Sequence, residues 1–228
     1  MTAGSHTPRA FSPAAERNRQ AVAAQLRLIL AGDDSAATAT VPETPRVSAS
    51  PTDSPRHLLE IASGTGQHAA YCAPTLPGWM WWPSDFSADG LASIADWCAD
   101  VPSVQTPLLL DVLQPSPWPG VPPQLDAIYC ANLLHIAPWA CCAGLMQGAA
   151  AHLKPGGLLL IYGPFVVPGQ TTAASNLAFD ADLRSRDPAW GLRSLSEVLA
   201  AAAVHRLGLR QQITMPANNL LLVFGRQG

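Results

Sequence analysis

A glycine-containing loop near residue 60 has the residue types and the spacing of a nucleotide-binding turn. The apolar run 58–61 leads into residues 62–66, which hold two glycines one residue apart, and an Ala-rich stretch follows. Glycine lets the backbone turn sharply and approach a ligand without a clash from Cβ. A helix that starts behind such a loop offers free N–H groups and the positive end of its dipole. The pattern is typical of the first strand–helix turn of a doubly wound α/β domain.

Two classes of cofactor fit this loop. Residues 64–69 match the dinucleotide fingerprint G-x-G-x-x-G/A, and Asp85 follows at about the distance of a ribose-binding acid. Residues 60–66 also resemble the S-adenosylmethionine loop of class I methyltransferases, an acid followed by x-G-x-G-x-G, with Ala62 in place of the first glycine. The loop alone leaves both cofactors open.

The order of the predicted elements favours the methyltransferase arrangement. Apolar runs that alternate with helices imply parallel strands, and two strands joined by only three residues must be antiparallel. No second βαβαβ half remains after residue 165 to hold a nicotinamide. We therefore predict an α/β fold with a Rossmann-like, seven-stranded, mostly parallel sheet, a closing antiparallel hairpin and helices on both faces. The strands are expected from 57 or 58 to 61 and at 79–82, 107–112, 125–130, 158–162, 209–215 and 219–224, and the helices at 13–31, 91–98, 138–153 and 195–207.

Three predicted strands end in an acid, at Glu60, Asp85 and Asp111. Ligands of parallel sheets bind beyond the carboxyl ends of the strands. The ammonium, ribose diol and adenine amino group of S-adenosylmethionine are all donors, and carboxylates accept such hydrogen bonds well. By resemblance to class I methyltransferases, Glu60 would lie near the methionine end, Asp85 at the ribose, and Asp111 with Val112 at the adenine. The full set of expected cofactor residues is Glu60, Ala62, Ser63, Gly64, Thr65, Gly66, Asp85, Asp111, Val112 and Asn132.

The chain divides into three predicted parts. Residues 1–32 hold a helix that begins after the N-cap Ser12, and we expect this helix to act as a lid over the site. Residues 33–55 have few apolar side chains and are expected to form a flexible linker. Residues 56–228 are expected to form the methyltransferase domain. Asn18 lies on the apolar face of the helix, where it either makes a buried hydrogen bond or faces a ligand.

The chain carries a set of motifs at residues 11–18, 59–68, 82–85, 132–136, 162–165, 179–184, 190–193 and 215–219. Together they resemble the methyltransferase-like protein 26 family, also called domain of unknown function 938. The resemblance covers nearly the whole chain except the linker, and Ala62 is the usual residue of that family. It implies the fold and the S-adenosyl-L-methionine cofactor strongly, and the substrate hardly at all.

Methyl transfer is an in-line displacement, so the side chains at the acceptor must first of all position it. The candidates for catalysis are His135, which can take a proton near neutral pH or be structural, together with Asn18 and Tyr162. No cluster has the spacing of metal ligands, so no metal is expected. The expected substrate-binding residues are Glu16, Arg17, Asn18, Phe179, Asp180, Arg184, Trp190 and Arg193.

Composition excludes several classes of partner. The net charge is −3 with no basic block, which argues against nucleic acid, and no apolar run is long enough for a membrane span. The N-terminus has no apolar signal region, and five cysteines without C-x-x-C spacing fit a reducing compartment, so we expect a cytoplasmic protein. The sequence predicts a methyltransferase for a small polar metabolite or natural-product intermediate. The alternatives are a non-catalytic S-adenosylmethionine-binding partner or sensor and, less favoured, an NAD-dependent oxidoreductase.

Overall fold

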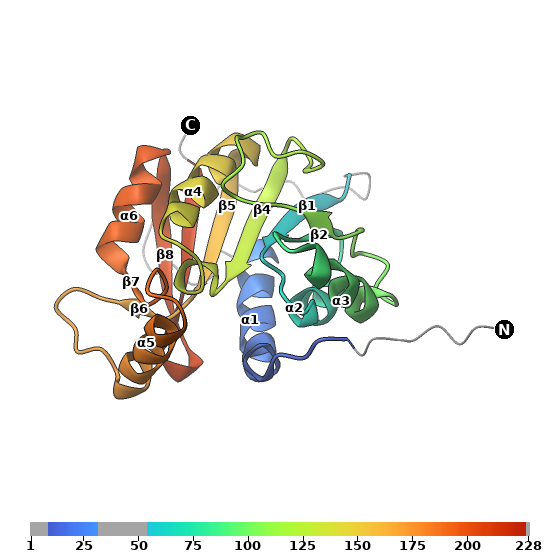
Figure 1. The fold of residues 1–228 in the computed structure, drawn as a ribbon. Coiled ribbons are helices and arrows are strands. Elements are labelled where there is room, and N and C mark those ends of the chain that lie inside the picture. The colour runs from blue at the N-terminus through green and yellow to red at the C-terminus, as the bar shows by residue number, and fades with distance from the viewer. Residues whose placement is uncertain (1–8, 32–53, 227–228) are drawn as a thin grey trace.

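The computed structural model describes residues 9–31 and 54–226. Its centre is a seven-stranded sheet with the strand order β3-β2-β1-β4-β5-β9-β8 (Figure 1). The strands from β3 to β5 run parallel, and β9 runs antiparallel to both β5 and β8. This confirms the predicted mostly parallel sheet with a closing antiparallel hairpin. The strands are β1 (Arg56–Ile61), β2 (Trp79–Asp85), β3 (Leu108–Leu109), β4 (Leu125–Ala131), β5 (Leu153–Gly163), β8 (Leu207–Met215) and β9 (Asn219–Arg226), with β6 (Phe165–Val166) and β7 (Arg193–Ser194) forming a separate pair.

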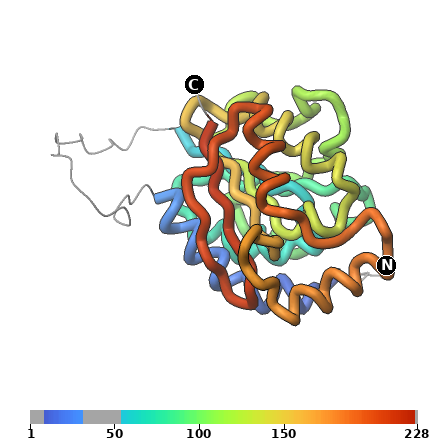
Figure 2. The backbone as a smooth tube through the Cα atoms, turned by 90° about the vertical axis from the view of Figure 1, so that its left-hand side faces the viewer, coloured from blue at the N-terminus to red at the C-terminus, as the bar shows by residue number. Residues whose placement is uncertain are grey.

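Helices cover both faces of the sheet. Figure 2, in which the β8–β9 hairpin faces the viewer, shows α1 on one side of the sheet and α6 on the other. Two apolar clusters match these two layers, one including Leu26 and Leu58 and the other including Leu145 and Leu59. Neighbouring leucines of β1 thus point to opposite faces, as parallel strands buried on both sides require. The helices are α1 (Pro13–Ala31), α2 (Gln67–Cys72), α3 (Ala88–Cys98), α4 (Ala140–His152), α5 (Ala174–Arg186) and α6 (Leu195–Val204).

The second strand is longer than predicted, because β2 continues through Pro83 to Asp85. The backbone N–H of Trp81 points to the β3 side, where it bonds Ser103 O at 2.8 Å. Pro83 lies two residues further on, so its missing N–H faces the same side. The β3 ladder on that side begins only at Ser84, so no ladder bond is lost. The prediction that β2 stops before Pro83 was wrong for this reason.

Other boundaries differ at the edges of the sheet. β3 has two residues instead of six, because it pairs only with Ser84 and Asp85. β5 begins at Leu153 instead of residue 158, since Leu153 pairs with Leu125 across a register shift and the predicted turn at 154–157 lies within the strand. α6 ends at Val204 rather than 207, because a turn follows and Leu207 opens β8. The helix α5 was not predicted.

The N-terminal helix is partly a core element. Val22, Ala23, Leu26 and Leu30 are buried in the cluster that also holds the centre of the sheet, and Arg56 donates to Leu30 O at 2.8 Å. Its first turns lie beside the glycine loop instead, as described below. Most of the predicted linker, residues 33–53, lies outside the described residues. Among the helices that the structure describes, none is long and apolar enough to span a membrane.

Candidate functional site

The glycine loop leaves the carboxyl end of β1 in three left-handed steps, with φ of 55° at Ala62, 57° at Gly64 and 91° at Gly66. Gly66 is required sterically, because a Cβ there would lie 2.7 Å from the Ile94 Cα. At Gly64 a Cβ would meet nothing within 4 Å among the described residues. One glycine therefore packs the loop against α3, and the other leaves an open backbone surface that a ligand can approach.

Hydrogen bonds from the end of β2 hold this loop in place. Asp85 accepts from the backbone N–H of Gly64 at 3.0 Å through one carboxylate oxygen and from the N–H of Ser87 at 3.0 Å through the other. Ser84 donates its hydroxyl to Glu60 O at 2.7 Å, and Ser63 N donates to Ser84 O at 2.8 Å. Each oxygen of Asp85 keeps a lone pair for a further donor. Two of the predicted acids, Glu60 and Asp85, therefore both lie at this loop.

Glu60 is buried, with 2% of its surface exposed. Its Oε2 atom accepts from Ser63 Oγ at 2.9 Å and from Trp81 Nε1 at 3.0 Å, while no described residue hydrogen-bonds Oε1. Burial raises the pKa of this carboxyl from 4.5 to about 7, against the opposing effect of the two hydrogen bonds. The free oxygen and the raised pKa make Glu60 a group that a ligand cation would ionise.

Three large apolar side chains lie exposed where β2 and β3 end. Phe86 is 75% exposed, Leu109 58% and Leu113 52%. Phe86 directly follows Asp85, and Leu113 donates its backbone N–H to Asp111 Oδ1 at 2.9 Å. Asp111 is half-buried and Val112 is buried, so the predicted adenine-end residues lie at this patch. Phe86 was not predicted from the sequence, although an aromatic residue directly after a strand-end acid was a usable signal.

The first turn of α1 is joined to the glycine loop through the buried side chain of Gln67. Its Oε1 accepts from Ser12 N at 2.6 Å and from Thr65 Oγ1 at 3.0 Å, and its Nε2 donates to Glu16 at 3.1 Å. Arg17 is exposed, and no described residue contacts its guanidinium through a hydrogen bond or ion pair. The structure therefore places Glu16 at the loop and leaves Arg17 at the surface.

Asn18 lies in a buried polar group one turn further along α1. Its Oδ1 lies 2.7 Å from His68 Nε2, and His68 Nδ1 lies 3.3 Å from the Tyr129 hydroxyl. Burial lowers the pKa of His68 to about 4 and raises the pKa of Tyr162, which a hydrogen bond from Asn18 partly opposes. Asn18 and Tyr162, both predicted for catalysis, are thus in contact, and Tyr162 is only 2% exposed.

Asn132 and His135 follow β4, but they occupy different environments. Asn132 is half-buried at a left-handed position, φ 59°, and donates its backbone N–H to Tyr162 O at 2.8 Å. His135 is fully buried, its ring packs edge-on against Phe165 at 5.1 Å, and both ring nitrogens lack a partner among the described residues. Burial, assisted by Arg193, lowers the pKa of His135 to about 3. The structure places Asn132 just beyond the carboxyl end of β4 and His135 in the core.

The other predicted substrate residues stabilise the loop between α5 and β7. Asp180 accepts from Arg184 Nε at 2.9 Å and from Leu192 N at 2.7 Å. Arg193 donates to the carbonyl oxygens of three residues, Leu134 at 2.7 Å, Ala137 at 2.8 Å and Ala189 at 2.6 Å. Phe179 and Trp190 are half-buried, and the Arg186 guanidinium lies 5.2 Å from the Trp190 ring centre. These contacts join α5 to the start of β7, and β7 to the loop after β4.

No group of three or more His, Cys, Asp or Glu side chains within residues 9–31 and 54–226 is arranged to hold a metal ion. The five cysteines are buried and unpaired, including the adjacent Cys141 and Cys142. Burial raises the pKa of both neighbouring thiols, that of Cys142 to about 12. Protonated, buried thiols act as small apolar side chains in the core.

Comparison with known proteins supports this arrangement. A family model described as "Protein of unknown function (DUF938)" matches residues 9–226. The chain is similar in structure to mitomycin 7-O-methyltransferase MmcR, at 18% identity and a TM-score of 0.66 over 76% of this chain and 49% of that one. It is also similar to human N-acetylserotonin methyltransferase in complex with SAM, at 13% identity and a TM-score of 0.65 over 75% and 48%. An O-methyltransferase family 2 protein from Planctomyces limnophilus, in complex with apigenin, matches at 22% identity and a TM-score of 0.65, over 90% of this chain and 62% of that one.

The chain spans between 48% and 62% of the length of these three structures. At these identities the likeness concerns the fold, which is the class I methyltransferase fold. The predicted fold class is therefore confirmed.

Proposed function

The chain belongs to the DUF938 family, and we propose that it is an S-adenosyl-L-methionine-dependent methyltransferase acting on a small polar metabolite or natural-product intermediate. The observation that carries this proposal is the open, left-handed loop at Gly64. The loop follows the carboxyl end of β1, and Asp85 at the end of β2 holds it by a hydrogen bond. The motifs at residues 59–68 and 215–219 also support the resemblance to the methyltransferase-like protein 26 family.

The residues at the loop fit the proposed cofactor. Glu60 has a free carboxylate oxygen for the ammonium of the methionine end, and Asp85 keeps lone pairs for the ribose hydroxyls. The exposed side chains of Phe86 and Leu109 offer an apolar surface for the adenine beside Asp111. When bound, S-adenosylmethionine supplies a methyl group on a positively charged sulfur.

The remaining residues of the site would position the acceptor rather than activate it. Asn132 is the polar side chain at the edge between β4 and β5, and its left-handed backbone is anchored on Tyr162 O. Asn18 and Tyr162 are in contact with each other, and His135 stays neutral inside the core. Holding two reactants at near-attack distance is worth effective molarities of about 10⁵ M or more, so no general base is required.

In this proposal only the first turns of α1 act as the N-terminal lid. The first turns of α1, with Glu16 and Asn18, close one side of the site through Gln67 and His68. The second half of the helix stays in the core through Leu26 and its neighbours. Opening would therefore involve only the first turns.

Binding calorimetry with S-adenosylmethionine, S-adenosylhomocysteine and NAD tests the cofactor. We expect both adenosyl ligands to bind and NAD to give no heat, because the sheet ends in a hairpin and residues 9–31 and 54–226 form no second nucleotide-binding half. Tight NAD binding without a response to the adenosyl ligands would favour an oxidoreductase and refute the proposal.

Transfer of label from methyl-labelled cofactor into a small-molecule extract of the source cells tests catalysis. We expect a labelled product that depends on the folded protein. Cofactor binding without any labelled product would favour the non-catalytic sensor or partner.

A further inference from the structure

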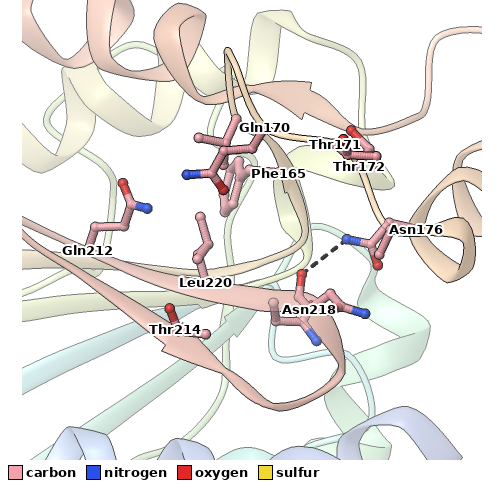
Figure 3. A pocket seen from close by; sticks show the side chains of 12 residues that line it. Phe165, Gln170, Thr171, Thr172, Asn176, Gln212, Thr214, Asn218 and Leu220 are labelled. Atoms are coloured by element: carbon pink, nitrogen blue, oxygen red, sulfur yellow. Dashed lines mark hydrogen bonds between the residues drawn. The ribbon is translucent and has the colours of Figure 1, made fainter.

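A pocket of about 240 Å³ lies beyond the carboxyl end of β5, outside the residues predicted from the sequence. It is formed by the segment between β6 and α5, by β8 and by the turn that joins β8 to β9. Figure 3 shows Gln212 at one side of the pocket and Asn176 with Asn218 at the other, with Phe165 and Leu220 between them. The pocket is smaller than the usual range of about 300–1,000 Å³ for ligand sites, so it suits a small molecule or one end of a larger one.

The lining of this pocket is polar but carries no charge. No Asp, Glu, Lys, Arg or His lines it, and Phe165 and Leu220 form an apolar floor. The side chains of Gln170, Gln212 and Thr214 have no hydrogen-bond partner in the part of the chain that the structure describes. Free amides and a hydroxyl around an apolar floor can pair with hydroxyl, carbonyl or amide groups of a ligand.

The rim of the pocket is held rigidly by backbone and side-chain contacts. Asn176, which is 7% exposed, donates to Asn218 O at 3.1 Å, and Asn218 donates to Ser175 Oγ at 3.3 Å. Ala217 and Asn218 are both left-handed, with φ of 56° and 57°. A left-handed alanine is costly, so the turn keeps this shape because its neighbours hold it.

The pocket lies close to the edge where the acceptor would react. Leu220 pairs with Gly163 at the end of β5, and Ala131, directly before Asn132, pairs with Tyr162 on the same strand. Two strand spacings of about 4.8 Å therefore separate the pocket floor from the end of β4, roughly 10 Å in all. A molecule of two rings can span this distance.

We propose that this pocket binds the methyl acceptor and selects an uncharged molecule that carries hydroxyl or amide groups on an apolar ring. The inference rests on the proposed methyltransferase function and adds its substrate class. An anionic or cationic acceptor would lose part of its hydration here and find no opposite charge in return. An uncharged one gains both the apolar floor and the free amides.

The test uses a matched set of probes with one ring and different heads: benzamide, benzoate and benzylammonium. Binding to the full chain, saturated with S-adenosylhomocysteine, is followed by amide chemical shifts in NMR. Gln211 and Gln212 are neighbours on β8, and they pair with Val223 and Leu222, which point to opposite faces of the sheet. Gln212→Leu therefore removes a pocket amide, and Gln211→Leu is its control with the same chemical change.

We expect benzamide to shift the pocket residues and to bind at least tenfold more tightly than either charged probe. Gln212→Leu should weaken benzamide about fivefold, the effect of one hydrogen bond, and Gln212→Trp should abolish binding by filling the pocket. Gln211→Leu should bind as the natural chain does. No benzamide binding, preference for a charged probe, or equal effects of the two leucine variants would overturn the inference. S-adenosylhomocysteine binding, measured on the same samples, reports separately on the proposed function.

Discussion

Replacing Glu60 by Gln should change how the stability of the protein depends on pH. Glutamine keeps an oxygen that can accept from Trp81 Nε1 and Ser63 Oγ, the two donors that now share Oε2. It cannot ionise, so it imitates the protonated carboxyl. The variant therefore isolates the cost of placing a charge at this buried position.

The size of the effect follows from the pKa of Glu60, which burial raises from 4.5 to about 7. Between these values the folded protein holds a proton that the unfolded chain has released, so its free energy of unfolding falls as the pH rises. At about 1.4 kcal/mol per pKa unit, the full loss is about 3 kcal/mol. The contribution is present below pH 4.5, and it is lost as the pH rises through about 7.

Urea denaturation of both proteins from pH 4.5 to 9 measures this loss as a difference. His68 and His135, whose pKa values burial lowers to about 4 and about 3, act in the opposite direction and hide the effect in the natural protein alone. They cancel in the comparison, because both proteins contain them. We expect the free energy of unfolding of Glu60→Gln, measured relative to that of the natural protein, to rise by about 3 kcal/mol between pH 4.5 and 8. If the free energies of unfolding of the two proteins changed in parallel with pH, or if that of the natural protein rose relative to the variant, Glu60 would not be a buried, protonated carboxyl.

Three further variants test the packing around the site. Gly66→Ala should lower stability by about 2 kcal/mol or more in urea denaturation, since its Cβ would lie 2.7 Å from the Ile94 Cα at a φ of 91°; a change below 0.5 kcal/mol would contradict the close approach. Asn18→Ala should cost about 1–2 kcal/mol by leaving His68 without its partner at 2.7 Å, and unchanged stability would show that this pair contributes nothing. His135→Leu should fold with no loss above about 1 kcal/mol, because it removes two unpaired buried nitrogens; loss of all methyl transfer in a folded variant would instead restore His135 as a catalytic residue.

The sheet could be predicted from the sequence because its strands are long apolar runs separated by turn residues. The run at 158–161 and the closing hairpin both lie where they were expected. The acids at strand ends could also be found, since parallel strands bring their carboxyl ends to one edge. What failed were boundaries that depend on tertiary pairing, such as Pro83 in β2 and Leu153 in β5.

Three lining residues of the pocket, Phe165, Asn218 and Asn219, lie in motifs named above, but its free polar side chains could not be found in this way. Gln170 comes from the segment after β6, whereas Gln212 and Thr214 lie two residues apart on β8, and amides and hydroxyls of this kind are ordinary on exposed loops and edge strands. Arg193 shows the opposite error, because a charged residue in a suggestive motif donates to three backbone carbonyl oxygens instead of facing a ligand. Residue type pointed to the proposed cofactor loop, whereas only the fold shows which polar side chains remain free.

The most direct test of the account is calorimetric binding of S-adenosylmethionine to Gly64→Arg and Gly78→Arg. Both glycines are left-handed, with φ of 57° and 79°, and at both a Cβ would meet nothing within 4 Å among the described residues. The backbone strain of the two variants is therefore similar, but Gly64 lies in the proposed cofactor loop, and Gly78 precedes β2 at the opposite end of the strands. We predict that Gly64→Arg abolishes binding and that Gly78→Arg binds as the natural protein does. Full binding by a folded Gly64→Arg variant would contradict the cofactor site.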